Sequence, residues 1–347
     1  MAQQIGADGW HLLQALEQPD APDLLKDQAC VQLLRQVWQQ YYDLSDGKAN
    51  WRAGPQAEED EGIIRSPYDP EARTSKKREM TWLGYKVHLT ETCAITEEAG
   101  RTGMTPHLIV QVHTTVAPVP DVQMTAPIQA ELVKAGHAPA QSIVDTGYVD
   151  AELLMSSQRK GITLLGPVLS DTSWQAKAGK GFDQAHFQID WTSGQATCPQ
   201  GQTSTRLSKA GERREIVFAT EVCAACPVRR DCTRSQTTGR VLHVRPKEAY
   251  EALAARREEQ QTAAFRQAYA TRSGIEGTLS QAVRGMGLRR AHYDGLAKVH
   301  LQHVLTAVAI NLVRIDAVLT NTPRGKTRRT HFERVGSHPG LQGRAAA

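Results

Sequence analysis

Apolar residues recur at helical spacing near the start of the chain. Trp10, Leu12, Leu13 and Leu16 mark one short amphipathic stretch, and residues 31–41 carry apolar positions three and four apart. The stretch 47–62 is polar and contains a run of acidic residues, which is typical of a loop. We therefore predict a helical segment with an acidic loop over residues 1–62.

From residue 63 onward, apolar and polar positions alternate in short runs. Two antiparallel strands followed by βαβα alternation predict an α/β fold, in which a mixed sheet is flanked by helices. Gly136 is expected to end the first helix of this region. The predicted elements are strands at 82–89 and 107–116 with a hairpin-like loop at 97–103, a helix at 122–135, a strand at 141–144, a helix at 150–159 and a strand at 162–165.

After residue 165 the alternation stops. Residues 166–245 are rich in Gly, Ser, Thr, Gln and Cys and hold only short strand candidates, which is typical of an insertion. Helical periodicity returns in one long helix from Lys247 to about Gly285, with a possible break near Gly274, and in a second from Leu296 to Leu319. The predicted segments are 1–62, 63–165, the insertion at 166–245, helices at 246–320 and a flexible basic tail at 321–347.

Composition narrows the class of protein. The chain has 347 residues, 40% hydrophobic and 22% charged, so a buried core is expected. No unbroken run of about 18 apolar residues and no export signal is present, so we expect a cytoplasmic protein without a membrane span. Residues 1–62 hold 4 Lys/Arg and 11 Asp/Glu, whereas the remainder holds 37 and 26. A basic body suits a polyanion such as nucleic acid; the alternative is an ordinary solvated surface.

Asp145 ends the predicted strand at 141–144 and precedes Gly147. Strand ends in α/β sheets open onto the site crevice, and a carboxylate there can bind a hard cation such as Mg²⁺. The alternative is a carboxylate that begins a turn or caps a helix.

Glu276 stands four residues after Arg272 and seven after Tyr269. On a helix these side chains share a face, so Glu276 can bind a metal while Arg272 approaches a phosphate. The alternative is an exposed ion pair of little energetic weight.

Together these motifs resemble bacterial insertion-sequence transposases of the DDE type, in the branch whose catalytic domain carries a cysteine-rich insertion. Tyr-x2-Arg-x3-Glu at 269–276 is similar to the signature of that group, and Asp145-Thr-Gly-Tyr to the motif of its second acidic residue. The resemblance runs from about residue 6 to 319. Further similar segments are 66–73, 84–89, 277–280, 287–291 and 295–298.

The resemblance implies a ribonuclease-H-like fold and metal-dependent cleavage and strand transfer of double-stranded DNA at insertion-sequence ends. Its acidic residues hold two divalent ions, Mg²⁺ or Mn²⁺, that stabilise the attacking and leaving oxygens. It makes Asp145 and Glu276 metal ligands and Arg272 a phosphate-positioning residue. A homodimer on DNA, in the cytoplasm with the nucleoid, is expected by the same analogy.

The chain departs from the family pattern at two places. Val283 stands where the family has a Lys, and Arg284 beside it is an approximate substitute. The first catalytic Asp, usually in Asp-Ser-Thr or Asp-Gly-Thr, has no counterpart, and neither has the helical N-terminal DNA-binding module. We expect that this Asp lies upstream and that the chain is a truncated transposase with impaired catalysis. Asp69 is an alternative first ligand, although its Pro-flanked setting favours a turn.

Four of the six cysteines form a separate cluster in the insertion. Cys198, Cys223, Cys226 and Cys232 give the spacing C-x24-C-x2-C-x5-C, and four thiolates suit a structural Zn²⁺ in a segment poor in apolar residues. The alternatives are free thiols or a redox pair. Cys30 and Cys93 are expected to be ordinary packed residues.

Basic residues surround the acidic motifs in the sequence. Placed near the carboxylates they would neutralise DNA phosphates, and otherwise they are solvated charges. The candidates are Arg73, Lys76, Lys77, Arg78, Arg284, Arg289, Arg290 and Lys298.

The sequence favours a DDE transposase catalytic domain. The alternatives are a catalytically inactive DNA-binding remnant, a zinc-stabilised module without DNA affinity, and a nuclease that cleaves without joining strands.

Overall fold

The N-terminal segment is a pair of packed helices with a small hairpin. The computed structural model describes residues 1–45, 47–56, 62–93, 107–210 and 213–322. Two helices, α1 (Ala2–Leu16) and α3 (Ala29–Tyr41), cross at Gly6 and Gly9. A Cβ on Gly9 would lie 2.0 Å from the ring of Trp38, whose indole N–H donates to the Gly6 carbonyl at 2.9 Å. Only glycine allows this approach. The elements are α1 (Ala2–Leu16), α2 (Asp23–Lys26), α3 (Ala29–Tyr41), β1 (Tyr42–Asp43) and β2 (Asn50–Trp51).

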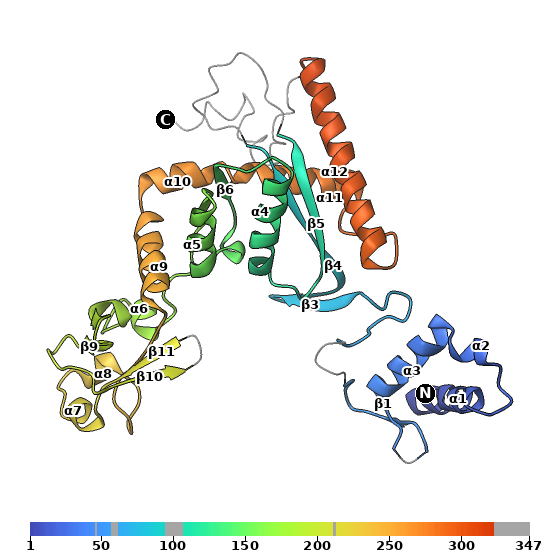
Figure 1. The fold of residues 1–347 in the computed structure, drawn as a ribbon, viewed down its shortest axis with the longest axis horizontal. Coiled ribbons are helices and arrows are strands. Elements are labelled where there is room, and N and C mark those ends of the chain that lie inside the picture. The colour runs from blue at the N-terminus through green and yellow to red at the C-terminus, as the bar shows by residue number, and fades with distance from the viewer. Residues whose placement is uncertain (46, 57–61, 94–106, 211–212, 323–347) are drawn as a thin grey trace, which may run out of the picture.

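An antiparallel sheet follows. The two strands predicted from alternation are confirmed as β4 (Met80–Glu91) and β5 (Ile109–Val116), and β3 (Arg73–Lys77) pairs with the first half of β4. In Figure 1, β4 and β5 cross the centre of the molecule beside α12. The predicted hairpin loop at 97–103 lies outside the described residues, as does the acidic run at 58–61.

The βαβα region also agrees with its predicted elements. The first helix ends at Lys134, two residues before Gly136, whose φ of +75° is a conformation that favours glycine. The elements are η2 (Asp121–Met124), α4 (Thr125–Lys134), β6 (Gln141–Ile143), η3 (Thr146–Tyr148), α5 (Ala151–Arg159) and β7 (Thr163–Leu165).

The prediction of one mixed sheet is not met in the described chain. β3, β4 and β5 form an antiparallel sheet, β6 and β7 form a parallel pair, and no backbone hydrogen bonds join β4 to β6. The chain is mixed α/β, but the structure does not directly show a continuous ribonuclease-H-like sheet. Alternation predicts strands without predicting their partners, because pairing is decided by tertiary contacts.

The region after β7 builds a small core of its own between two short sheets. Six buried apolar side chains form it, and three of the clustered cysteines pack against it. These six are Phe187, Ala196, Ile216, Phe218, Leu242 and Val244. The elements are α6 (Trp174–Ala178), η4 (Gln184–His186), β8 (Gln188–Asp190), β9 (Gln195–Thr197), β10 (Arg206–Ala210), β11 (Arg213–Val217), α7 (Thr220–Ala224), α8 (Arg229–Cys232) and β12 (Val241–Val244).

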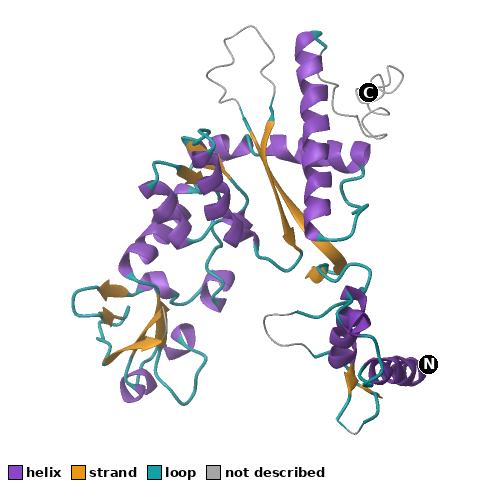
Figure 2. Ribbon diagram, turned by 45° about the vertical axis from the view of Figure 1, so that its right-hand side comes forward, coloured by secondary structure: helices purple, strands orange, loops and turns teal. Residues whose placement is uncertain are grey.

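The long helix predicted over 247–285 is three helices: α9 (Lys247–Glu259), α10 (Ala263–Ala270) and α11 (Ser273–Met286). The first break comes where the Thr262 hydroxyl accepts from the Phe265 N–H, and the second comes at Arg272, before Gly274. Figure 2 shows α12 (Leu296–Leu319) as the longest straight helix.

α12 fixes β5 to the rest of the molecule. It packs on β5 through Ala307 and Ile310, and the Asn311 amide bonds both the N–H and the carbonyl of Ile109 at 2.8 Å. By length and composition alone α12 could also cross a membrane, although polar residues interrupt its apolar sequence.

Candidate active site

One guanidinium joins the two carboxylates that the sequence singled out. Arg272 Nη2 lies 3.2 Å from Asp145 Oδ2, and Arg272 Nη1 lies 2.9 Å from Glu276 Oε1. Because the nitrogens of a guanidinium have fixed spacing, both acids are held within reach of a single cation. The structure therefore brings together residues from the turn after β6 and from the start of α11.

Both carboxylates are open to solvent. The side chain of Asp145 is 56% exposed and that of Glu276 is 65% exposed, whereas that of Arg272 is 24% exposed. The ring of Tyr269 lies 5.9 Å from the Arg272 guanidinium carbon. The site is thus accessible to a large substrate from the side of the acids.

The residues around Arg272 keep its guanidinium charged. Burial lowers the pKa of Arg272, but its hydrogen bond to Glu276 and the nearby Tyr269 and Asp145 outweigh this and raise that pKa above its usual value. Burial also raises the pKa of Tyr269, and Arg272 opposes that shift in part. At neutral pH the site holds a cationic guanidinium and a neutral phenol.

Tyr148 holds the turn that carries Asp145 in place through two hydrogen bonds. Its hydroxyl lies 2.6 Å from Nδ1 of the buried His88 on β4, and its carbonyl accepts from the Thr125 hydroxyl at 2.7 Å. Burial lowers the pKa of His88, and the charge of Asp121 offsets only part of this, so the ring is neutral. The Asp145 carboxylate itself accepts the Thr146 N–H at 2.8 Å, which is the turn-capping contact considered as an alternative role.

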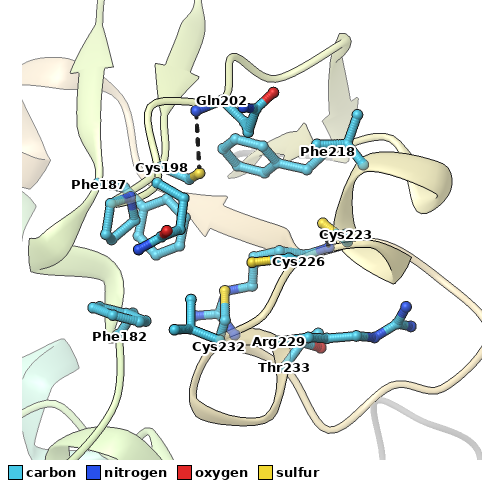
Figure 3. A pocket seen from close by; sticks show the side chains of 15 residues that line it. Phe182, Phe187, Cys198, Gln202, Phe218, Cys223, Cys226, Arg229, Cys232 and Thr233 are labelled. Carbon is cyan, nitrogen blue, oxygen red and sulfur yellow. Dashed lines mark hydrogen bonds between the residues drawn. The ribbon is translucent and has the colours of Figure 1, made fainter.

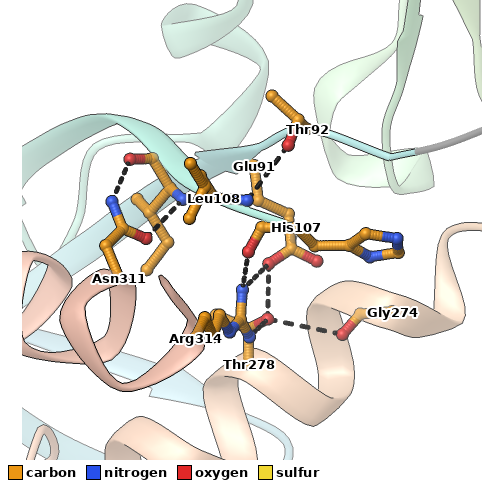
Figure 4. A network of polar contacts seen from close by, with 9 residues as sticks. Glu91, Thr92, His107, Leu108, Gly274, Thr278, Asn311 and Arg314 are labelled. Carbon is orange, nitrogen blue, oxygen red and sulfur yellow. Dashed lines mark hydrogen bonds and ion pairs between the residues drawn. The ribbon is translucent and has the colours of Figure 1, made fainter. Parts of the chain in front are cut away.

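The helix that carries Glu276 is anchored by a buried network at its first two turns (Figure 4). Arg314 of α12 lies 3.1 Å from the Glu91 carboxylate, whose side chain is 7% exposed, and Arg314 also donates to the His107 carbonyl. Thr278 of α11 accepts from Arg314 and donates to Glu91. Sequence reasoning did not identify this network; its one signal is that Arg314 is the single Arg of a mainly apolar helix.

Asp69 has a different set of partners. It accepts from the Tyr85 hydroxyl at 2.7 Å and caps the turn at Ala72, while Glu71 accepts from the Leu296 N–H. Burial and the two carboxylates raise the pKa of Tyr85, which keeps its hydroxyl protonated as a donor. The described residues contain no group of three His, Cys, Asp or Glu side chains that could hold a metal ion, so Asp69 does not join Asp145 and Glu276 in such a group.

The candidate DNA-binding residues form two groups along the chain. Lys76 and Lys77 are exposed on β3, and Arg78 is exposed in the turn before β4, whereas Arg73 is half-buried and donates to the carbonyls of Pro70 and Ala72. The group after Glu276 is exposed at all four positions: Arg284, Arg289, Arg290 and Lys298.

The four clustered cysteines line one small cavity of about 30 Å³ (Figure 3). The sulfurs of Cys198 and Cys223 each accept a backbone N–H at 3.4 Å, from Gln202 and Arg240. Burial raises the pKa of Cys232 to about 11. None of these four described cysteines forms a disulfide.

Cys30 and Cys93 lie outside the cluster. Both are exposed, so the expectation that they are packed is wrong. A helical or strand setting does not reveal which face of the element is covered.

Comparison with known protein families gives a match in the second half of the chain. Residues 197–316 match the family described as Transposase DDE domain. The matched range contains the four clustered cysteines, Arg272 and Glu276, and it excludes Asp145. No curated protein and no solved structure matches the chain. Residues 197–316 are thus similar to a transposase DDE domain, and the rest of the chain lies outside this match.

Proposed function

We propose that the chain acts on double-stranded DNA as the catalytic part of a DDE transposase, cleaving and joining strands at insertion-sequence ends next to the nucleoid. The observation that carries the proposal is the shared contact of Asp145 and Glu276 with Arg272. Two acids from distant segments converge on one cation, in an exposed position, within and beside the range that matches the family.

The donor set of this site fits a divalent cation. Mg²⁺ in phosphate-processing sites is commonly bound by one or two carboxylates, with waters and substrate phosphates completing its shell. Asp145 and Glu276 would supply those carboxylates to Mg²⁺ or Mn²⁺. A divalent ion there would stabilise negative charge on the oxygens of the reacting phosphate.

The chain's own residues hold and orient the DNA. Arg272, released from the carboxylates, presents a fork of N–H donors that matches a phosphate. The neutral Tyr269 hydroxyl is a further donor at the same place. The exposed basic groups on β3 and from the end of α11 to the start of α12 neutralise flanking phosphates, so binding should weaken steeply as salt rises.

A nicking assay on a labelled DNA end with Mg²⁺ or Mn²⁺ tests this. We expect metal-dependent cleavage that falls on the order of 100-fold or more in Asp145→Asn and Glu276→Gln, because each change removes a charged metal ligand. Asp23→Asn, an exposed acid on α2, is the matched control and should cleave normally. Joined-strand products support transposition, whereas nicks alone support a nuclease of similar chemistry.

The second candidate is a catalytically inactive DNA-binding remnant, and the lack of a third acidic group at Asp145 and Glu276 in the described chain favours it. Salt-dependent DNA binding with no metal-dependent cleavage would support it. If the chain neither binds DNA nor cleaves it, both proposals are contradicted, and a structural module without DNA affinity is the remaining interpretation.

The proposal includes a structural Zn²⁺ in the cysteine cavity. Four sulfurs suit tetrahedral zinc, and N–H donors to two of them favour the thiolate form. Burial raises the pKa of Cys232, and the charge of Arg240 offsets this only in part, a balance that bound zinc would reverse. In the described arrangement the sulfurs face the same cavity without forming a closed metal-ligand group, so binding would draw them together.

Metal analysis of the purified chain tests the zinc site. We expect one zinc per chain, lost in Cys226→Ser, together with a lower melting temperature after chelation. Cys30→Ser and Cys93→Ser are matched controls because both cysteines are exposed outside the cluster. Zinc at less than stoichiometric amounts in the unmodified chain, or retained in a variant with all four cysteines replaced, would contradict the site.

A further inference from the structure

One side of α12 is apolar and uncovered. The opposite side packs into the protein through Val299, His303, Ala307 and Ile310, all of which are buried. Figures 1 and 2 show the C-terminal part of α12 standing clear of the other described elements. Contiguous apolar surface of this extent marks an interaction site. The exposed fractions run from 38% to 80%, for Leu301, Leu305, Val308, Leu312, Val313, Ile315 and Leu319.

Six of these residues are spaced as in a coiled coil. The intervals alternate between four and three residues, which gives a mean repeat of 3.5. The stripe is about 27 Å long. We call it the α12 seam: Leu301, Leu305, Val308, Leu312, Ile315 and Leu319.

We propose that the α12 seam binds the same seam of a second copy of this chain, forming a helix pair. A 3.5-residue repeat packs against another helix with the same repeat. The parts of the chain outside the description do not supply one. Residues 323–347 contain three large apolar residues, Phe332, Val335 and Leu341, and residues 94–106 contain only Ile95 and Met104.

The charges beside the seam permit pairing of identical helices. The positions that would flank the interface are almost uncharged, so two copies meet with little like-charge repulsion. Asp316 is the one charged member of the set Gln302, Val304, Ala309, Asn311, Asp316 and Val318.

The area is sufficient for a dimer. Six large side chains that are 38% exposed or more present on the order of 500 Å² per helix, or about 1,000 Å² for the pair, which is near the lower limit of specific interfaces. In an obligate dimer, elements next to α12 would add further contacts to this area.

A lipid bilayer is a poorer occupant than a second copy. α12 is anchored to β5 through Asn311 and to β4 through Arg314, which pairs with Glu91. A helix that crossed a membrane would have to lose these contacts and expose Arg314 to lipid.

Sedimentation of the full chain tests the proposal. We expect a dimer at micromolar concentration and a shift to monomer, at least 10-fold weaker in association, for Leu305→Glu and for Leu312→Glu. Both side chains are exposed, so circular dichroism should not change. Leu24→Glu, an exposed leucine on α2, is the matched control and should remain dimeric.

A monomeric unmodified chain, or seam variants that dimerise normally, would overturn the proposal. Binding of the monomer to phosphatidylcholine vesicles, lost in the seam variants, would instead assign the stripe to a lipid surface. None of these readouts depends on DNA cleavage.

Discussion

At the residue scale, Arg272 is the side chain that connects the two candidate acidic residues. Its contact with Glu276 follows from the four-residue spacing and could be predicted from the sequence. Its contact with Asp145 could not, because no periodicity relates positions in different elements. Because the guanidinium pairs with two exposed acids, its contribution to the free energy of unfolding is small. Its role in the site is to hold the two carboxylates near each other.

Arg272→Lys should therefore separate stability from activity. A lysine keeps the charge but cannot bridge two carboxylates or present a bidentate fork to phosphate. We expect the free energy of unfolding to change by less than about 1 kcal/mol, while metal-dependent DNA cleavage falls at least as far as in Arg272→Ala. Denaturant titration and the nicking assay measure the two quantities. Full cleavage by Arg272→Lys would show that only the charge matters.

Substitution in the buried pair of Glu91 and Arg314 should change stability strongly, in contrast to substitution of Arg272. Removing one partner leaves an unpaired charge, so Arg314→Met should cost about 3–5 kcal/mol. The double variant Glu91→Leu with Arg314→Met should recover much of that loss, because no buried charge remains. Thermal unfolding measures both. Asp23→Asn in the exposed pair with Lys26 is the control and should change stability by about 0–1 kcal/mol.

At the element scale, apolar periodicity predicted most helices and strands of the described chain, but not where one helix stops and the next begins. The stretch 247–285 has one continuous helical pattern, and the structure divides it at Thr262 and at Arg272. These breaks place Tyr269 on α10 and Glu276 on α11, with Arg272 between them. A Thr that can cap a helix was the available signal for the first break.

Two glycines on helices should respond oppositely to alanine. Gly9→Ala places a methyl group against Trp38, so we expect α1 and α3 to separate at a cost of about 1–3 kcal/mol. Gly285→Ala on α11 meets no atom within 4 Å and should stabilise the helix by about 0.5–1 kcal/mol. Chemical denaturation compares the two, and equal effects would contradict the close crossing of α1 and α3.

At the scale of the whole molecule, buried histidines tie stability to pH. Burial, together with His300, lowers the pKa of His303 to about 4 from its ordinary 6.5, and the ring bonds the Thr114 hydroxyl at 2.7 Å. The unfolded chain therefore binds a proton at a higher pH than the folded chain does.

Stability should fall as pH drops from about 6.5 to about 4. His303 contributes fully above 6.5 and loses about 2–3 kcal/mol across that interval. His303→Gln, which keeps a polar group near Thr114, should flatten the slope of unfolding free energy against pH. His137→Gln, at an exposed position, should not alter it. An unchanged slope in His303→Gln would assign the acid sensitivity to other groups.

The sequence by itself determined most helices and strands, the four-cysteine spacing and the acidic motifs, because each depends on residues close together along the chain. Only the tertiary structure decided that Asp145 meets Arg272, that β6 pairs with β7 but not with β4, and which side of α12 remains uncovered. These features depend on contacts between distant segments. A local pattern shows that a strand or an apolar face needs a partner, but the partner itself is selected by packing in three dimensions.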